Sequence, residues 1–172
     1  MAKGSTDTDM GLKAIFKEMG KLKSLCVKVG VTEDVGSQTT DSGATLAQIA
    51  AWNELGVLGP PFSQHGSGKW FIPPRPFIRG FADGKHELTA QTMEKLSGQV
   101  SGGKITAETA LRQLGQYGQD GVKSYIRDGT FTQNADSTIA KKGSSHPLID
   151  TGTLRNSVRY QVIEKPVDKV KK

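Results

Sequence analysis

The residue types that most often carry out catalysis are scarce in this chain, and their spacing matches no catalytic pattern. The histidines have neither a cysteine nor another histidine at metal-ligand spacing; they are His65, His86 and His146. The single cysteine, Cys26, has no CxxC companion, and we expect it to be a packing residue. Glu33 and Asp34 form a carboxylate pair, but in a predicted loop, whereas acid–base catalysis needs groups held on rigid elements. We therefore predict that the protein is not an enzyme and binds no metal or cofactor.

The loops that bind phosphate or present a nucleophilic serine are also missing from the sequence. The P-loop pattern GxxxxGK[ST] fails at both ends around Gly68 and Lys69, because Ser63 replaces its first glycine and Trp70 its final Ser or Thr. No GxSxG nucleophile elbow occurs. A small hydrolase with an unrecognised site is therefore the weakest of the functions considered.

Asp150 is the carboxylate with the most distinctive surroundings, because it follows an apolar pair and precedes Thr151 and Gly152. This position predicts an N-cap, with Ile149 and Leu154 placed for the hydrophobic staple that accompanies such a cap. A catalytic carboxylate is the competing interpretation. Substitution by asparagine separates the two, because asparagine caps about as well as aspartate but cannot replace a catalytic carboxylate.

Length, hydropathy and charge narrow the class of protein. The chain has 172 residues and 18.4 kDa, which is the size of one domain that can bury a core without disulfides. No apolar run approaches the roughly 20 residues of a membrane span, and residues 1–9 lack the apolar core of a secretory signal, so we expect no membrane partner. The net charge of +6 is concentrated toward the C-terminus, where the last eight residues include four lysines. DNA binding through a basic final strand and tail is therefore kept as an alternative function.

Hydrophobic spacing predicts the elements of the first third of the chain. Helical spacing indicates a helix over residues 12–22, and strict alternation indicates a half-buried strand over 25–31. Residues 32–43 are polar and predict a flexible loop. Helical spacing returns over 44–55, and Gly56 is placed to stop that helix.

Two longer helices are predicted further along. Residues 57–74 are rich in glycine and proline and predict an irregular segment. A helix is expected to begin at Pro76 and continue to about residue 99, where Gly102 and Gly103 interrupt the chain. Thr106 is placed to cap the second helix, which we expect to reach residue 125.

Three glycines interrupt the inner face of this second long helix at a spacing of three residues. Each of Gly115, Gly118 and Gly121 costs about 1 kcal/mol relative to alanine inside a helix. Together they form a smooth ridge that another backbone can approach closely. The ridge is explained either by packing within the chain or by contact between subunits.

The remaining residues complete an α+β fold. A polar loop over 129–145 leads to a turn with a short helix over 149–157 and then to an alternating strand over 158–163. We expect this strand and the strand at 25–31 to form a small antiparallel sheet that packs against the two long helices.

Residues 1–165 are predicted to be one domain with extended loops. After Pro166 the chain becomes a charged segment, and we expect residues 166–172 to be a flexible tail.

Four segments carry more information than composition and spacing do, and we refer to them as the four motif stretches. They are AAWNELG at 50–56, IPPRPFIR at 72–79, TIAKKG at 138–143 and HPLIDTGTLRNSV at 146–158. In this order they resemble the virion-morphogenesis family, the neck and tail-completion proteins of long-tailed double-stranded DNA phages. The resemblance covers about residues 25–163. The 63–69 insert and the N-terminal helix lie outside the pattern.

The resemblance implies a structural virion protein at the neck or the tail-proximal end, made and assembled in the host cytoplasm. Its partners would be copies of itself in a ring of six or twelve, the neighbouring head-closure or connector and tail-tube proteins, and packaged DNA through non-specific contact. The residues carried over from the motifs have an interaction or structural role; they are Asn53, Glu54, Gly56, Pro73, Pro74, Arg75, Pro76, Phe77, Arg79, Lys142, Gly143, Pro147, Leu148, Asp150, Thr151, Gly152, Leu154 and Arg155.

The proline cluster of the second motif stretch has a physical meaning of its own. Prolines at 73, 74 and 76 restrict the backbone and hold Phe77 and the arginines at 75 and 79 in one orientation. Such a fixed arrangement suits a corner of the fold or a protein interface, where arginine and aromatic residues are enriched. If Arg75 serves an interface, its replacement by alanine should leave thermal stability nearly unchanged.

Overall fold

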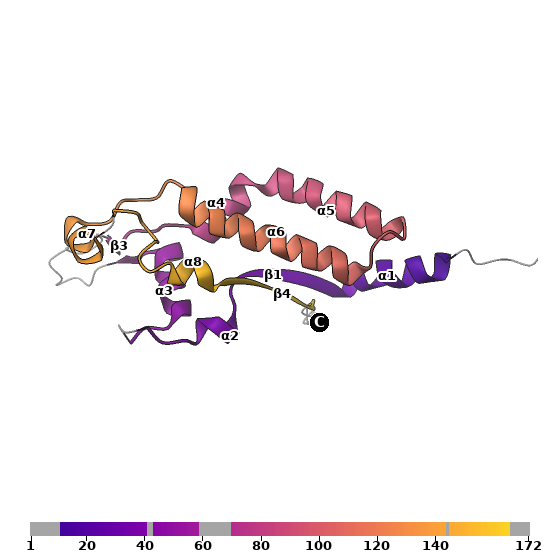
Figure 1. Cartoon of the computed structure of the whole chain (residues 1–172), viewed down its shortest axis with the longest axis horizontal. Coiled ribbons are helices and arrows are strands. Elements are labelled where there is room, and N and C mark those ends of the chain that lie inside the picture. Colours follow the sequence, from indigo (N-terminus) through magenta and orange to yellow (C-terminus); the bar gives the residue numbers. More distant parts are fainter. Residues whose placement is uncertain (1–10, 41–42, 59–69, 144, 166–172) are drawn as a thin grey trace, which may run out of the picture. The chain divides into compact units, whose positions relative to one another are not determined.

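The computed structural model describes residues 11–40, 43–58, 70–143 and 145–165, and its fold is α+β, as the sequence predicts (Figure 1). The 63–69 insert and the tail over 166–172 lie outside the described residues. Strands β1 (Leu25–Val31) and β4 (Val158–Glu164) pair with each other. The two strands predicted from alternating hydrophobicity, although distant in sequence, are therefore confirmed as neighbours in one sheet.

The chain divides into two compact units, and each has its own buried cluster. The first unit comprises Met1–Val27, Glu87–Leu114 and Val162–Lys172. The second unit comprises Lys28–His86 and Gly115–Gln161. The four motif stretches all belong to the second unit.

The first unit is built mainly from helices. Its helical segments are α1 (Leu12–Ser24), nearly all of α5 (His86–Ser101) and the beginning of α6 (Ala107–Asp128). Leu96 and Val100 of α5 and Ala110 of α6 are buried, and Met19 and Leu22 of α1 pack against them. No residue of α1 is itself fully buried, so this helix contributes one partly covered face.

A charged contact also links α1 to the start of α6 within the first unit. Glu18 Oε2 accepts a hydrogen bond from the Ala107 backbone N–H at 2.8 Å, and Glu18 Oε1 accepts one from Lys21 Nζ at 2.6 Å. A carboxylate at this position satisfies a free N–H of the first helical turn and interacts favourably with the helix dipole.

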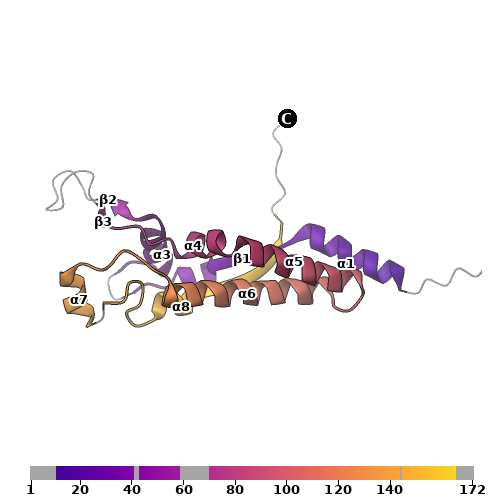
Figure 2. The same ribbon diagram turned by 90° about the horizontal axis from the view of Figure 1, so that it is seen from above.

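The helix expected over residues 76–99 is in fact two helices, so this prediction is wrong in its continuity (Figure 2). Helix α4 covers Phe77–Gly84 and α5 begins at His86. Lys85, with φ −126° and ψ 16°, lies outside helical geometry between them. Glycine is a poor helix former, and Gly84 stands at the end of α4, where a helix is most easily interrupted.

The glycine ridge of α6 packs against side chains of its own chain. A methyl group at Gly118 would lie 2.9 Å from Val29 Cγ2 of β1, while one at Gly115 would collide with the ring of Tyr160 of β4. A methyl at Gly121 would collide with the ring of Phe81 of α4. The glycines therefore let α6 lie close to both strands and to an aromatic ring, and the ridge gives no support to a contact between subunits.

Two segments predicted as loops contain short helices. Helix α2 (Glu33–Gly36) lies inside the segment predicted as a loop over 32–43, and α7 (Asp136–Lys142) lies inside the loop predicted over 129–145. Both helices are too short to show a hydrophobic repeat, which is the pattern on which helix prediction depends.

The helix predicted over 44–55 is confirmed as α3 (Leu46–Leu55), which begins at a capping box between Thr45 and Gln48. Gly56 ends it with φ 77°, a conformation that favours glycine. Strands β2 (Val57–Leu58) and β3 (Trp70–Ile72) follow and pair in antiparallel fashion (Figure 2).

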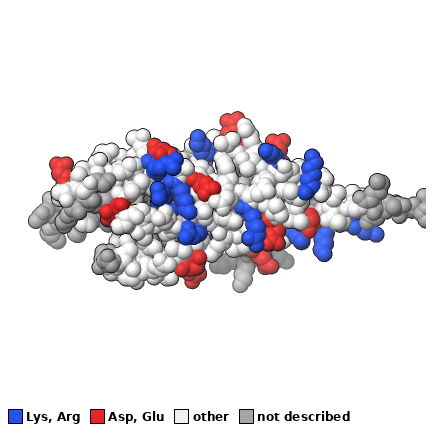
Figure 3. All heavy atoms as spheres, in the orientation of Figure 1, with Lys and Arg blue, Asp and Glu red and all other residues white. Residues whose placement is uncertain are grey.

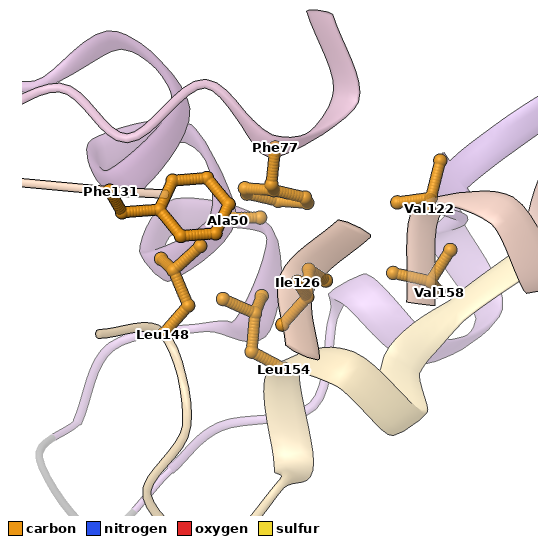
Figure 4. Packing of buried hydrophobic residues seen from close by; sticks show 8 residues of the cluster. All are labelled: Ala50, Phe77, Val122, Ile126, Phe131, Leu148, Leu154 and Val158. Carbon is orange, nitrogen blue, oxygen red and sulfur yellow. The ribbon is translucent and has the colours of Figure 1, made fainter. Parts of the chain in front are cut away.

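The core of the second unit gathers side chains from distant parts of the sequence (Figure 4). Its buried residues are Ala50, Phe77, Val122, Ile126, Phe131, Leu148, Leu154 and Val158. Phe77 is fully buried among them, with 0% of its surface exposed. Leu154 belongs to the short helix α8 (Thr153–Ser157), which leads directly into β4. The first, second and fourth motif stretches therefore meet in one core.

Candidate functional site

The first and second motif stretches are joined by direct hydrogen bonds. The Arg75 backbone N–H donates to the Asn53 carbonyl at 2.6 Å, and Arg75 Nη1 donates to Asn53 Oδ1 at 3.4 Å. Asn53 Nδ2 donates in turn to the Ile49 carbonyl one turn earlier in α3, at 2.8 Å. Asn53 thus links the end of α3 to the proline-rich segment before α4.

Glu54 completes this link by capping α4. Its Oε2 accepts a hydrogen bond from the Ile78 N–H and its Oε1 one from the Arg79 N–H, each at 2.9 Å. The residue that precedes the helix, Pro76, has no side chain able to cap it. A carboxylate from α3 therefore satisfies the free N–H groups at the start of α4. The adjacent motif residues Asn53 and Glu54 each have a defined partner in the second stretch.

Arg75 is buried, with only 7% of its surface exposed, and is a structural element of the fold. Its Nε donates to the Thr132 carbonyl at 2.7 Å and its Nη2 to the Gln133 carbonyl at 3.2 Å. Burial lowers the pKa of the guanidinium from its usual range. This burial argues against Arg75 as a pure interface residue, and we expect its removal to lower stability, because three oxygen atoms would lose a donor.

The fourth motif stretch turns sharply before α8. Leu148 has a left-handed backbone with φ 62°, an uncommon conformation for leucine, and its side chain is buried in the core. Gly152, with φ 79°, is the N-cap residue of α8. At the end of the third stretch, Gly143 closes α7 with φ 66°. The glycines of both motif stretches thus stand at turns that require positive φ.

The prediction that Asp150 caps a helix is wrong. Helix α8 begins at Thr153, its N-cap is Gly152, and no side chain makes a cap hydrogen bond. Asp150 is exposed and makes no hydrogen bond within the part of the chain that the structure describes. The staple residues are nevertheless both in the core, since Leu154 is buried and Ile149 packs against the same cluster.

The four motif stretches line one cleft of about 750 Å³ in the second unit. Its motif residues are Asn53 from the first stretch, Ile72, Pro73 and Arg75 from the second, Thr138 from the third, and Leu148, Asp150, Thr151, Gly152, Thr153 and Leu154 from the fourth. Ligand clefts typically measure about 300–1,000 Å³. This convergence makes the cleft the candidate functional site.

Several lining residues were not singled out from the sequence. They are Gln38, Thr39, Thr40, Leu46, Ile49, Phe71, Asn134 and Ala135. Most of them belong to segments that the sequence predicts as loops or irregular chain. Their place beside the cleft depends on how these segments fold back against α3, which residue types do not indicate. An isolated bridge between Thr39 and Thr45 brings the first of these segments beside α3.

The other predicted residues lie away from the cleft lining. Phe77 is in the core, Gly56 ends α3, and Gly143 ends α7. The backbone N–H of Arg79 contacts Glu54, and Arg155 Nη2 donates to Asn156 Oδ1. Glu54, Pro74, Pro76 and Pro147 do not line the cleft either, and the side chain of Lys142 lies outside the described part of the structure.

The described residues hold no cluster of three or more histidine, cysteine or acidic side chains that could bind a metal ion. Two histidines fall within these residues. His86 Nδ1 lies 3.0 Å from the Asp83 carbonyl, and His146 Nε2 lies 2.8 Å from the Arg127 carbonyl. His146 is half-buried. No helix among the described residues is long and apolar enough to cross a membrane.

Three basic residues of the second unit lie near enough for the charges of the two arginines to act on the lysine, and we call them the basic cluster: Lys123 of α6, Arg155 of α8 and Arg159 of β4. Burial lowers the pKa of Lys123, and the positive charges of Arg159 and Arg155 lower it further, whereas Asp120 acts in the opposite direction. The face drawn in Figure 3 shows basic and acidic side chains interspersed. Comparisons with family models, with curated proteins and with solved structures find no match to this chain.

Proposed function

We propose that the protein is a non-catalytic virion assembly protein, which acts at the head–tail junction or the tail-proximal end of a long-tailed phage. In this role it forms a ring that completes the tail or joins it to the head. The cleft of the second unit is its contact site for a neighbouring protein. Copies of the chain, head-closure or connector proteins and tail-tube proteins are the candidate neighbours.

The observation that carries this proposal is the convergence of the motif stretches. The four motif stretches, whose sequences and order resemble those of the phage family, are spread over more than 100 residues. All four contribute residues to a single cleft. Two of them are held together by the Asn53 and Glu54 contacts. A cleft lined by apolar side chains, hydroxyl groups and amides is suited to binding another protein chain. The described residues around it include no catalytic constellation, so binding is the function that the geometry supports best.

The proposal is tested by deleting the gene from the genome that encodes it and imaging the resulting particles by electron microscopy. The expected result is an accumulation of filled heads and separate tails, with joined particles restored by the gene supplied in trans. Native mass spectrometry of the purified protein, alone and with tail tubes, should detect a ring. Joined infectious particles in the complete absence of the gene would contradict the proposal.

DNA binding remains the second candidate function, because the Lys123, Arg155 and Arg159 cluster gives it a specific observation. Two of these residues belong to the C-terminal region where the sequence concentrates positive charge. Neutralising a phosphate with each cation makes binding to duplex DNA depend steeply on salt, with a slope of about −0.9 per contact. The acidic neighbour Asp120 reduces this attraction.

Fluorescence anisotropy with a labelled DNA duplex at several salt concentrations separates the two functions. If the protein binds DNA through this cluster, affinity should fall steeply with salt, and Arg159→Gln should weaken it. Arg112→Gln is the matched control, because Arg112 is an exposed arginine that pairs with Glu108 on α6. Absence of salt-dependent binding would leave the assembly role as the single candidate.

A further inference from the structure

Two charged side chains that line the cleft differ in their exposure to water. Arg75 and Asp150 are the charged side chains among the described residues that line it. Asp150 is exposed and therefore hydrated, whereas Arg75 retains only 7% of its surface. A charge removed from water interacts more strongly with an opposite charge than a hydrated one does. The electrostatic character of the cleft therefore depends chiefly on Arg75.

The charge of Arg75 has no counter-ion among the described residues. Its side chain donates to two backbone carbonyls and one side-chain amide, and all three acceptors are neutral. Burial alone accounts for the lowered pKa of this guanidinium, with no carboxylate contributing. Buried charges in proteins are usually paired, because an unpaired one is costly.

The hydrogen-bonding capacity of Arg75 is also incompletely used. A guanidinium has five N–H groups, one on Nε and two on each terminal nitrogen. The described contacts use one N–H on each nitrogen, which leaves one on Nη1 and one on Nη2. A carboxylate is the group that accepts two hydrogen bonds from a guanidinium in a matched geometry.

The remainder of the cleft suits an extended peptide better than a small anion. Ile49, Ile72 and Phe71 supply apolar surface, and 55% of the surface of Phe71 is exposed. The hydroxyl groups of Thr39, Thr138 and others supply hydrogen-bonding partners around them. A single carboxylate compound would leave this apolar surface uncovered, whereas a peptide with apolar side chains next to an acidic one would cover it.

We propose that the cleft binds an extended segment of a partner protein, and that a carboxylate side chain of this segment pairs with the buried guanidinium of Arg75. This inference rests on the proposed function in taking the partner to be a neighbouring protein of the assembly. It specifies the chemistry that the neighbour must present, which is an Asp or Glu flanked by apolar residues. Pairing supplies the counter-ion that Arg75 lacks in the described chain.

The test uses the purified full chain and displayed random 12-residue peptides. Peptides retained by the wild-type protein are sequenced, synthesised, and measured again with the acidic residue changed to its amide, Glu to Gln or Asp to Asn. This comparison changes the peptide alone, so the fold of the protein is not affected. We expect the retained peptides to share an acidic residue, and the amide versions to bind at least about tenfold more weakly.

A matched pair of protein variants locates the binding to the cleft. Thr138→Trp places a large ring on a lining residue of α7 that is exposed, and it should abolish peptide binding. Ser137→Trp changes the adjacent exposed residue of the same helix, which does not line the cleft, and it should leave binding within about twofold. Circular dichroism checks that both variants are folded.

Three results would overturn the inference: no retained peptides, retained peptides without a shared acidic residue or with equal affinity for the amide version, and equal loss of binding in both tryptophan variants. These outcomes are distinguishable from failure of the proposed function. A chain that enters virions but binds no acidic peptide refutes the carboxylate pairing alone. A chain that binds acidic peptides in its cleft but is dispensable for particle assembly refutes the virion role alone.

Discussion

The buried hydrophobic cluster of the second unit joins eight side chains from α3, α4, α6, α8, β4 and the loops between them, whereas the cluster of the first unit joins three, from α5 and α6. The second unit also has more side chains that bind backbone groups distant in sequence. In the second unit, Arg75 and Glu54 bind backbone groups 24 to 58 residues away. In the first unit, Glu18 makes such a contact with the Ala107 N–H, and Lys165 Nζ makes one with the Leu22 carbonyl.

This difference indicates that the loops are held in place mainly in the second unit. Side chains that bind distant backbone groups hold loops in place, and in the second unit they do so beside the cleft. The first unit depends on helix packing and leaves apolar side chains of α1 in contact with water, with Leu12 57% and Phe16 66% exposed. The motif stretches all fall in the unit that is held more tightly.

The largest expected effect is that of Phe77→Ala in the core of the second unit. Because Phe77 is fully buried, the substitution should lower the free energy of unfolding by about 3–5 kcal/mol, as large-to-small changes in protein cores do. Urea denaturation followed by circular dichroism measures the loss. Leu88→Ala, at a residue of α5 with 48% exposure, is the control and should change stability little. A loss below about 1 kcal/mol for Phe77→Ala would contradict the proposed packing.

Arg75→Ala should follow, with a loss of about 3 kcal/mol, because hydrogen bonds to a charged donor are removed and buried oxygens lose their partner. Arg75→Lys keeps the charge but cannot reach all three acceptors, and it should be intermediate. Thermal melting of the three proteins checks the order. Unchanged melting of Arg75→Ala would restore the interpretation of Arg75 as a pure interface residue.

Glu54→Ala tests the contact between the first two motif stretches more narrowly. Loss of a capping side chain typically costs about 0.5–2 kcal/mol, and here two N–H groups of α4 lose their acceptor. Glu94→Ala is the control on α5, because Glu94 is exposed and makes no hydrogen bond within the described chain. Hydrogen exchange of the Ile78 and Arg79 amides should accelerate in the first variant alone. Equal exchange in both variants would show that Glu54 does not cap α4.

A smaller, pH-dependent effect is expected in the first unit from Glu18. The hydrogen bond from Lys21 and that from the Ala107 amide lower the pKa of this carboxyl below its usual 4.5. A lowered pKa means that the contribution to stability is complete above the usual value and is lost as pH falls through the folded-state pKa. Melting temperatures of the wild type and Glu18→Gln should therefore converge as pH falls below the usual carboxyl value of 4.5. A constant difference across this range would contradict the assignment.

The smallest effect is expected for Asp150. Because it is exposed and does not cap α8, Asp150→Ala should change stability by less than about 0.5 kcal/mol. Gly152→Ala is the contrasting variant, since forcing alanine into a backbone with φ 79° costs about 1–2 kcal/mol. Scanning calorimetry measures the stability of both variants. A loss of stability above about 0.5 kcal/mol for Asp150→Ala would restore the capping interpretation.

The sequence predicted the regular elements well and the local turns poorly. Strand β1 was predicted with the observed bounds and β4 to within one residue, because alternation is read directly from residue types. Helices α2 and α7 were missed because neither is long enough to show a repeat. The Asp150 cap was wrong because cap preference is a local rule, and here the chain reverses at Leu148 and Gly152 instead.

The candidate site was predictable in part. The motif stretches contain eleven of the nineteen residues that line the cleft. They do not indicate that Arg75 is buried, because its partners include the carbonyls of residues 132 and 133. A backbone carbonyl that accepts a hydrogen bond cannot be recognised from the sequence, because every residue has one. The contribution of Gln38, Thr39 and Thr40 depends equally on how the chain folds back toward α3.

The proposal that the cleft is the contact site of an assembly protein is tested most directly by complementation of the genome that encodes the chain. A genome that lacks the gene is supplied with the wild-type protein, Thr138→Trp or Ser137→Trp, and infectious joined particles are counted. We predict that the wild type and Ser137→Trp restore particles, whereas Thr138→Trp, although folded, leaves heads and tails separate. Full complementation by Thr138→Trp would contradict it.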